Sequence, residues 1–179
     1  MTGGLTGELV RLRARMEADV PVLEAELHDD VAGTVRGSRR PWRPLSPGAQ
    51  ASRNRVAEPT DREASFSVVT LEADALAGKA ALWGINTHSR SAHIGLALRP
   101  AYRGKGLGTD VVRVLCHYGF VVLGLHRIQV DTLADNHAMI TAAERVGFRR
   151  EVVERQATFV LGEFIDEAIL GLLAHEWTP

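Results

Sequence analysis

Residues Arg99–Asp110, RPAYRGKGLGTD, carry three glycines within five positions. A β-type run precedes this segment, and apolar residues at helical spacing follow it. Glycine lets the backbone adopt positive φ and lets a ligand approach the main chain closely. Exposed N–H groups at a helix N-terminus bind anions, and Arg103 and Lys105 add positive charge to the same segment. The segment therefore predicts a strand, a phosphate-binding loop and a helix, in that order.

Two common phosphate-binding motifs do not match this loop. The dinucleotide fingerprint G-x-G-x-x-G requires a glycine where the chain has Thr109. The Walker motif G-x-x-x-x-G-K-[ST] is also absent. A glycine-rich turn that caps a helix and binds nothing is the structural alternative. Three glycines beside two cations favour a bound phosphate or pyrophosphate instead.

The segments around the loop predict the fold class. Three consecutive β-type runs separated by short turns precede the loop, as in an antiparallel meander. A helix, a strand, a second helix closed by Gly147 and a hairpin around residues 161–163 follow it. This order predicts an α+β fold with a single mixed sheet. We expect strands over 8–13, 65–72, 76–85, 91–98 and 127–133, helices over 16–28, 106–123 and 135–146, and two further strands within 154–173.

Residues 29–62 form the least regular part of a chain whose 179 residues predict one domain, 1–179. Ser46-Pro47 is typical of an N-cap followed by proline in the first turn, which predicts a short helix to Val56. Arginines dominate the charge of this region. They indicate either a ligand with an anionic feature or solvated side chains, and they disfavour a cationic ligand such as a polyamine. They are Arg36, Arg39, Arg40, Arg43, Arg53, Arg55 and Arg62.

Composition narrows the class of protein. The formal net charge is −1, so no broad positive field attracts nucleic acid or an anionic membrane. The 45% hydrophobic and 24% charged residues are typical of a globular protein. No apolar run approaches the roughly 20 residues of a membrane span, and the N-terminus lacks a signal-peptide core, so we expect a cytoplasmic protein. The single cysteine, Cys116, excludes an internal disulfide and a multi-cysteine metal site, and we expect no metal.

The loop and its flanks resemble the GNAT superfamily of acetyl-CoA-dependent N-acetyltransferases. Arg103–Gly108 matches the family signature (Q/R)-x-x-G-x-(G/A). The resemblance covers roughly the whole chain and is nearest to the branch of ribosomal-protein and spermidine acetyltransferases. Outside the signature it rests on Ile94–Leu98, Asn136, Glu144–Phe148 and Glu176-Trp177. It implies a single mixed, mostly antiparallel sheet, splayed at its centre and flanked by helices.

The resemblance also implies where the co-substrate acetyl-CoA would bind. Its pyrophosphate would lie on the loop amides, and its pantetheine arm would extend along the preceding strand. A main-chain N–H there would polarise the thioester carbonyl. Asn136 would contact the cofactor, although its position is also typical of a residue that starts a helix. The expected cofactor-binding residues are Ala97, Leu98, Arg103, Gly104, Lys105, Gly106, Leu107, Gly108, Thr109 and Asn136.

Candidate catalytic side chains are fewer. The acceptor amine must lose a proton, so a base is required near it. His93 and Asp131 are the candidates and Glu72 is a third, each with an ordinary structural alternative. The usual acid of the family, a tyrosine seven residues after the asparagine, is replaced by Ala143. The serine that ribosomal-protein acetyltransferases often use is replaced by Met139.

The resemblance predicts an enzyme, an N-acetyltransferase that acts on a primary amine of a protein N-terminus or of a small molecule. It implies no nucleic-acid or membrane partner, and the habit of the family predicts a homodimer. Three hypotheses stay open, of which the acetyltransferase is the first. The second is a catalytically silent acyl-CoA-binding module, because the usual acids are missing. The third is an RNA-binding domain, for which the arginine-rich region is the only support.

Overall fold

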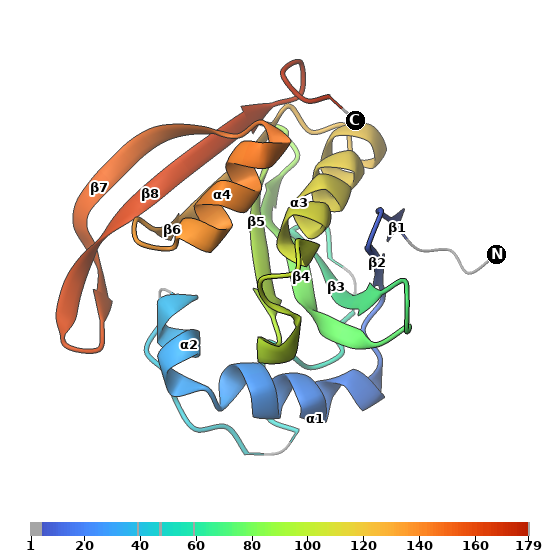
Figure 1. The fold of residues 1–179 in the computed structure, drawn as a ribbon, viewed down its shortest axis with the longest axis vertical. Coiled ribbons are helices and arrows are strands. Elements are labelled where there is room, and N and C mark those ends of the chain that lie inside the picture. The colour runs from blue at the N-terminus through green and yellow to red at the C-terminus, as the bar shows by residue number, and fades with distance from the viewer. Residues whose placement is uncertain (1–4, 39, 47, 59, 179) are drawn as a thin grey trace.

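The computed structural model describes residues 5–178 apart from 39, 47 and 59, and these residues form one eight-stranded sheet (Figure 1). The strand order is β1-β2-β3-β4-β5-β6-β8-β7. Neighbouring strands are antiparallel except for β5 and β6, which are parallel. The strands are β1 (Leu5–Thr6), β2 (Val10–Arg13), β3 (Glu63–Thr70), β4 (Leu76–Asn86), β5 (Ser91–Leu98), β6 (Arg127–Leu133), β7 (Arg149–Val160) and β8 (Glu163–Leu173). The expected mixed, mostly antiparallel sheet is confirmed.

Helices cover both faces of this sheet. On one face α3 (Leu107–His117) and α4 (His137–Val146) pack side by side (Figure 1). The helical segment from Glu17 to Arg36 lies on the other face. Neighbouring residues of a strand point to opposite faces, and in β3 Val68 packs into the core beneath α3 while Ser67 donates a hydrogen bond of 2.8 Å to Asp19. That segment comprises η1 (Glu17–Asp19), α1 (Val20–Leu23), the π-helix η2 (Glu24–His28) and α2 (Val31–Arg36). The remaining helical turns are η3 (Pro100–Tyr102) and the π-helix η4 (Tyr118–Val122).

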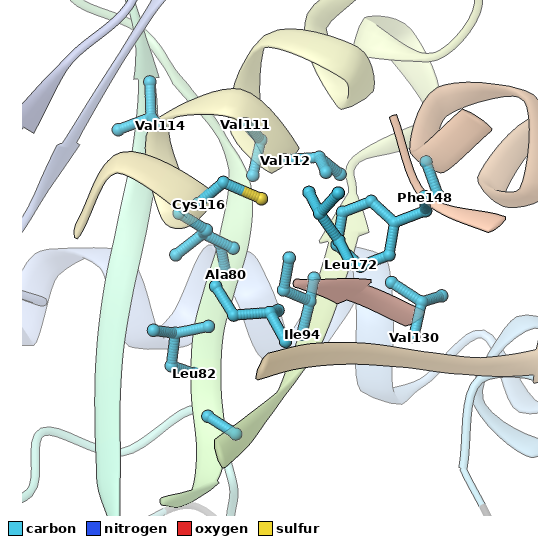
Figure 2. Close-up of a cluster of buried hydrophobic side chains, with 14 of the residues drawn as sticks. Ala80, Leu82, Ile94, Val111, Val112, Val114, Cys116, Val130, Phe148 and Leu172 are labelled. Atoms are coloured by element: carbon cyan, nitrogen blue, oxygen red, sulfur yellow. The ribbon is translucent and has the colours of Figure 1, made fainter. Parts of the chain in front are cut away.

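The main core lies between the sheet and the α3–α4 face. Alternate residues of the central strands point into it, as the period of two in a strand requires. Figure 2 shows side chains of α3 above those of the central strands and of β8. Burial of each large apolar side chain stabilises the fold by roughly 1.5–3 kcal/mol. The labelled core residues are Ala80, Leu82, Ile94, Val111, Val112, Val114, Cys116, Val130, Phe148 and Leu172.

Two helices expected from the sequence are present in altered form. The segment expected over 16–28 is helical, but it changes from 3-10 to α to π geometry along its length. The helix expected over 106–123 remains α-helical only to His117 and then continues as a π-helix. Gly147 closes α4 with a φ of 108°, as expected for a glycine in the left-handed conformation.

The helix expected from Ser46 to Val56 is wrong. Residues 46 and 48–56 form turns and irregular segments with no helix, and Pro47 lies outside the described residues, as does Arg39. Gly48 has a φ of 74°, and the hydroxyl of Ser52 accepts a hydrogen bond of 3.0 Å from the main-chain N–H of Asn54. Such local side-chain bonds compete with helix formation.

A short helix that the sequence reading missed, α2, lies inside the region expected to be irregular. Asp30 caps it by accepting a hydrogen bond of 3.0 Å from the N–H of Gly33. Aspartate is a preferred N-cap residue, so this signal was present in the sequence.

At the centre of the sheet, β5 and β6 pair at their N-terminal ends and separate toward their C-terminal ends. Only three residue pairs join β5 to β6, and the last of them is His93 with Gln129. Beyond this pair β5 stays paired with β4 up to Leu98, and β6 stays paired with β8 up to Leu133. The two parallel strands therefore diverge, and each keeps a main-chain edge that faces the other without pairing. We call the space between these edges the wedge; it confirms the expected splay.

Candidate active site

The glycine-rich loop lies at the N-terminus of α3. Gly104 and Gly106 have φ values of 73° and 80°, and Gly106 is the N-cap residue of α3. A Cβ added to Gly104 would meet nothing within 4 Å, so the backbone conformation, and not crowding, favours glycine there. The positive φ values that the sequence predicted for this loop are present at these two positions.

The main-chain N–H groups of residues 104–108 form a row without acceptors. None of them donates a hydrogen bond to another described residue. The next two, those of Thr109 and Asp110, donate to the carbonyl of Gly106 at 3.1 and 3.4 Å. Free N–H groups at the positive end of an eleven-residue helix form an anion site. The loop thus provides donors for an anionic ligand without any side chain.

Neither backbone conformation nor crowding within the protein requires a glycine at position 108. Its φ is not positive, and an added Cβ would lie 4.0 Å from Leu98 Cδ1, an ordinary contact distance. Glycine in a helix is less favourable than alanine by about 1 kcal/mol. Because glycine has no side chain, the space beside the row of N–H groups stays open, and a ligand can approach the main chain there.

The two cations of the loop have neighbours in this structure. Arg103 Nε donates a hydrogen bond of 2.9 Å to the carbonyl oxygen of Leu98. Lys105 Nζ lies 5.7 Å from the ring centroid of Tyr102, which also faces the guanidinium of Arg99. Arg103 therefore already bonds one of the main-chain groups that the resemblance assigns to the pantetheine arm.

Asn136 has both ends of its amide engaged. Its Oδ1 accepts a hydrogen bond of 3.3 Å from Met139 N, which caps α4, and its Nδ2 donates to Thr132 Oγ1 at 2.9 Å. The preceding Asp135 forms an ion pair of 2.6 Å with Arg36 of α2, and this hydrogen bond lowers the pKa of Asp135. The pair brings α2 to the end of β6, where the wedge is open.

The two base candidates meet at the narrow end of the wedge. His93 Nδ1 lies 2.6 Å from Asp131 Oδ2, although 38 residues separate them in sequence. The His93 ring stacks on Trp83 with centroids 4.4 Å apart and an interplanar angle of 22°. The Asp131 side chain is 5% exposed and that of His93 31%. Glu72, by contrast, is exposed in the turn between β3 and β4.

The positions considered for an acid face the core. Ala143 is fully buried and Met139 packs against the same cluster. Cys116 is buried among apolar side chains, and burial raises the pKa of its thiol far above the usual value. Tyr118 packs edge-on against Phe66 at 5.4 Å. The geometry therefore supports neither Cys116 nor Tyr118 as the acid.

Asp110 is a supporting residue that the sequence reading missed. It is 2% exposed, and its carboxylate accepts hydrogen bonds from the N–H groups of Glu8, Leu9 and Val10 at 3.1, 2.7 and 3.0 Å. These bonds fasten the β1–β2 turn to the first turn of α3. An acidic residue in the first turn of a helix was the available signal.

Lys79, one of only two lysines in the chain, had no role assigned to it from the sequence. It lies on β4 opposite Ala97, and its Nζ donates a hydrogen bond of 2.5 Å to Asn54 Oδ1. Burial, with repulsion from Arg15, lowers the pKa of Lys79 to about 8. A largely buried lysine thus joins the turns of residues 48–56 to the sheet.

Other features of the described residues lie away from the wedge. A cavity of about 620 Å³ is lined by Arg155, Gln156 and Asp166 in the β7–β8 hairpin. A second, of about 300 Å³, lies between β1, α3 and Trp177. Among the described residues, no three metal-ligating side chains gather, and no helix has the length and apolar character needed to cross a membrane. The candidate site therefore consists of the loop, the wedge and the His93–Asp131 pair.

Comparison with known protein families and sequences points to one family. The model of the acetyltransferase (GNAT) domain matches residues 10–149. The chain is 32% identical over 114 residues to "Probable N-acetyltransferase YjcK" of Bacillus subtilis, which covers 63% of either chain. It is 28% identical over 101 residues to spermidine N(1)-acetyltransferase of Escherichia coli, which covers 56% of this chain and 54% of that protein. The matched region thus spans less than two thirds of these relatives.

Solved structures share the fold over nearly the whole chain. Spermidine N-acetyltransferase from Vibrio cholerae, solved with CoA and spermine, has a TM-score of 0.74 at 20% identity and covers 93% of this chain and 96% of that one. A structure described as "Probable acetyltransferase" has a TM-score of 0.81 at 22% identity, with 99% of each chain covered. At these identities the likeness establishes the architecture alone.

Proposed function

The chain belongs to the GNAT acetyltransferase family, and on this basis we propose that it transfers the acetyl group of acetyl-CoA to a primary amine. One observation carries the proposal: the wedge between β5 and β6 opens next to the row of free N–H groups at the start of α3. An extended arm and a pyrophosphate, joined in one molecule, require these two neighbouring features.

The residues present suit coenzyme A. The N–H groups of residues 104–108 and the open space at Gly108 suit the pyrophosphate. The unpaired edge of β5, at Ala97 and Leu98, suits the amides of the pantetheine arm, as an added strand would. Arg103 keeps further N–H donors for a phosphate while it bonds Leu98, and Lys105 adds charge. Asn136 supports the site by fixing the start of α4 at the mouth of the wedge.

The bound thioester supplies the acetyl group. Transfer forms a C–N bond and breaks the C–S bond, and the amine gives up a proton. His93 is the proposed base, with Asp131 as its partner, because its Nε2 has no partner among the described residues. The sulfur leaves as a thiolate, which a thiol pKa of about 8.5 permits without a dedicated acid.

The relatives support one class of acceptor over another. A spermidine acetyltransferase among them supports a small-molecule amine, and a protein N-terminus is the second candidate. A catalytically silent acyl-CoA-binding module is the alternative, because Ala143 and Met139 stand where the resemblance to the family implies an acid, and both pack into the core.

A panel of amines tests the proposal. The protein is incubated with acetyl-CoA and, in turn, with spermidine, lysine and a peptide with a free N-terminus, while thiol release is measured. Amine-dependent release supports the transferase. Calorimetric binding of coenzyme A with no release for any amine favours the silent module, and absence of binding overturns both.

Two matched glycine variants test the loop. Gly104 and Gly124 have φ values of 73° and 64°, and a Cβ at either meets nothing within 4 Å. Valine at either position therefore adds similar backbone strain. Gly104→Val is expected to lose coenzyme A binding, whereas Gly124→Val retains it. Equal affinities in the two variants would remove the loop from the proposal.

A further inference from the structure

A row of hydrogen-bonded side chains crosses the sheet and ends on His93. Arg127 Nη1 lies 2.8 Å from Glu151 Oε1, and Arg127 Nη2 donates to Gln129 Oε1 at 3.0 Å. Gln129 Nε2 donates to Asp131 Oδ1 at 2.6 Å, and Asp131 Oδ2 lies 2.6 Å from His93 Nδ1. We call these five residues the relay. They belong to β7, β6 and β5 and meet the narrow end of the wedge.

The direction of each hydrogen bond in the relay is determined by its donors. A guanidinium can only donate, so the Gln129 amide must present its oxygen to Arg127. The amide nitrogen then faces Asp131 and can only donate to it. Asp131 Oδ1 is therefore an acceptor, and one orientation of the Gln129 amide satisfies both of its partners.

The last bond determines the tautomer of His93. A carboxyl group is a much stronger acid than an imidazolium, so Asp131 is the carboxylate and His93 Nδ1 carries the proton. In the neutral ring the lone pair then lies on Nε2. Stacking on Trp83 holds the plane of the ring. The low exposure of the Asp131 side chain, 5%, limits competition from water for these bonds.

We propose that Arg127 and Gln129 are positioning residues that, through Asp131, hold His93 in the Nδ1–H tautomer and keep Nε2 free to accept a proton. The inference rests on the proposed function only for the origin of that proton, the acceptor amine. The ring geometry itself follows from the side chains described.

Gly171 on β8 makes room for the outer end of the relay. It pairs with Gln129 on one side and with Arg149 on the other. A Cβ at Gly171 would lie 2.6 and 2.7 Å from Arg127 Nη1 and Nη2 and 2.4 Å from Glu151 Oε1. These atoms are the ends of flexible side chains, so Gly171→Ala is expected to displace the Arg127–Glu151 pair while the strand remains paired. This substitution perturbs the relay without removing any of its members.

Nitrogen-15 NMR of the ligand-free protein reads the tautomer directly. The two-bond proton–nitrogen spectrum is expected to show the Nδ1–H form for His93, whose signals His93→Gln identifies by their loss. Gln129→Met and Gly171→Ala are expected to give a mixture of tautomers. Arg150→Met is the control, because it removes the surface ion pair of Arg150 with Glu144 outside the relay and should leave the His93 signals unchanged.

Kinetics with a competent amine supply the second readout. Loss of a general base costs about 10²–10⁴-fold in rate, so Gln129→Met and Gly171→Ala should lower kcat by a smaller factor, about tenfold, with the KM for acetyl-CoA retained. An Nε2–H tautomer in the wild type, or an unchanged tautomer and kcat in both variants, would overturn the proposal. An Nδ1–H tautomer without acetyl transfer to any amine would instead overturn the proposed function and leave the relay in place.

Discussion

Among individual residues, Gly108 offers a test in which stability and binding change in opposite directions. Its φ suits any residue, and a Cβ there makes only an ordinary contact with Leu98. Gly108→Ala should raise the free energy of unfolding by up to about 1 kcal/mol, because alanine is the better helix residue. The same methyl group should weaken coenzyme A by occupying the space over the N–H row. Urea denaturation without ligand and calorimetry with coenzyme A measure the two effects; stabilisation with unchanged affinity would contradict the loop assignment.

Lys79 should make the free energy of unfolding depend on pH in the alkaline range. Its pKa is about 8 in the folded state against 10.5 for an ordinary lysine. Between these values the unfolded chain holds a proton that the folded chain has released, so the free energy of unfolding rises with pH. Relative to Lys79→Met, the wild type should gain stability from pH 8 to 10. The raised pKa of Cys116 acts in the opposite sense but is common to both proteins. Urea denaturation at several pH values measures the difference, and a constant difference would contradict the lowered pKa of Lys79.

At the level of secondary-structure elements, the fastening of β1 and β2 to α3 depends on Asp110. Asp110→Ala leaves three main-chain N–H groups without their acceptor, one of them the buried N–H of Val10. We expect a loss of about 2–3 kcal/mol in the free energy of unfolding. Asp135→Ala is the matched control, since this acid lies just before α4 and its contact with a distant element is an exposed ion pair with Arg36, which is worth about 0–1 kcal/mol. Equal losses in urea denaturation would show that Asp110 has no special structural role.

The elements also show where sequence patterns succeed. Strands β3 to β5 were predictable because β-type runs alternate with short turns. Helices α3 and α4 were predictable because each carries an apolar stripe, which Gly147 closes in α4. The region 29–62 was less tractable. The one helix among its described residues, α2, has no buried residue, so no apolar stripe marks it. Ser46-Pro47 carried a capping signal, but the turns that follow are held by Ser52 and Asn54, whose burial depends on Lys79 and Glu24 in distant elements.

For the molecule as a whole, ligand binding should protect a limited part of the backbone from hydrogen exchange. The wedge leaves main-chain groups of β5 without strand partners, and the loop leaves a row of free N–H groups. Saturating coenzyme A should slow exchange in peptides that span residues 94–109 and leave the hairpin of β7 and β8 unchanged. Exchange followed by mass spectrometry measures both regions in one experiment. Protection centred on the hairpin would place the ligand elsewhere.

Local chemistry in the chain was sufficient to predict the loop with positive φ at Gly104 and Gly106, the order of the elements from β3 to β8, and the family. These features depend on residues close in sequence, where spacing determines backbone conformation directly. The contacts between distant segments required the folded chain. The bond between His93 and Asp131 spans 38 residues, and those between Asp110 and residues 8–10 span 100 or more. The divergence of β5 from β6 likewise depends on which strands pair and where pairing stops. No local pattern encodes these distances, because the sheet brings side chains together by register across strands and not by their order along the chain.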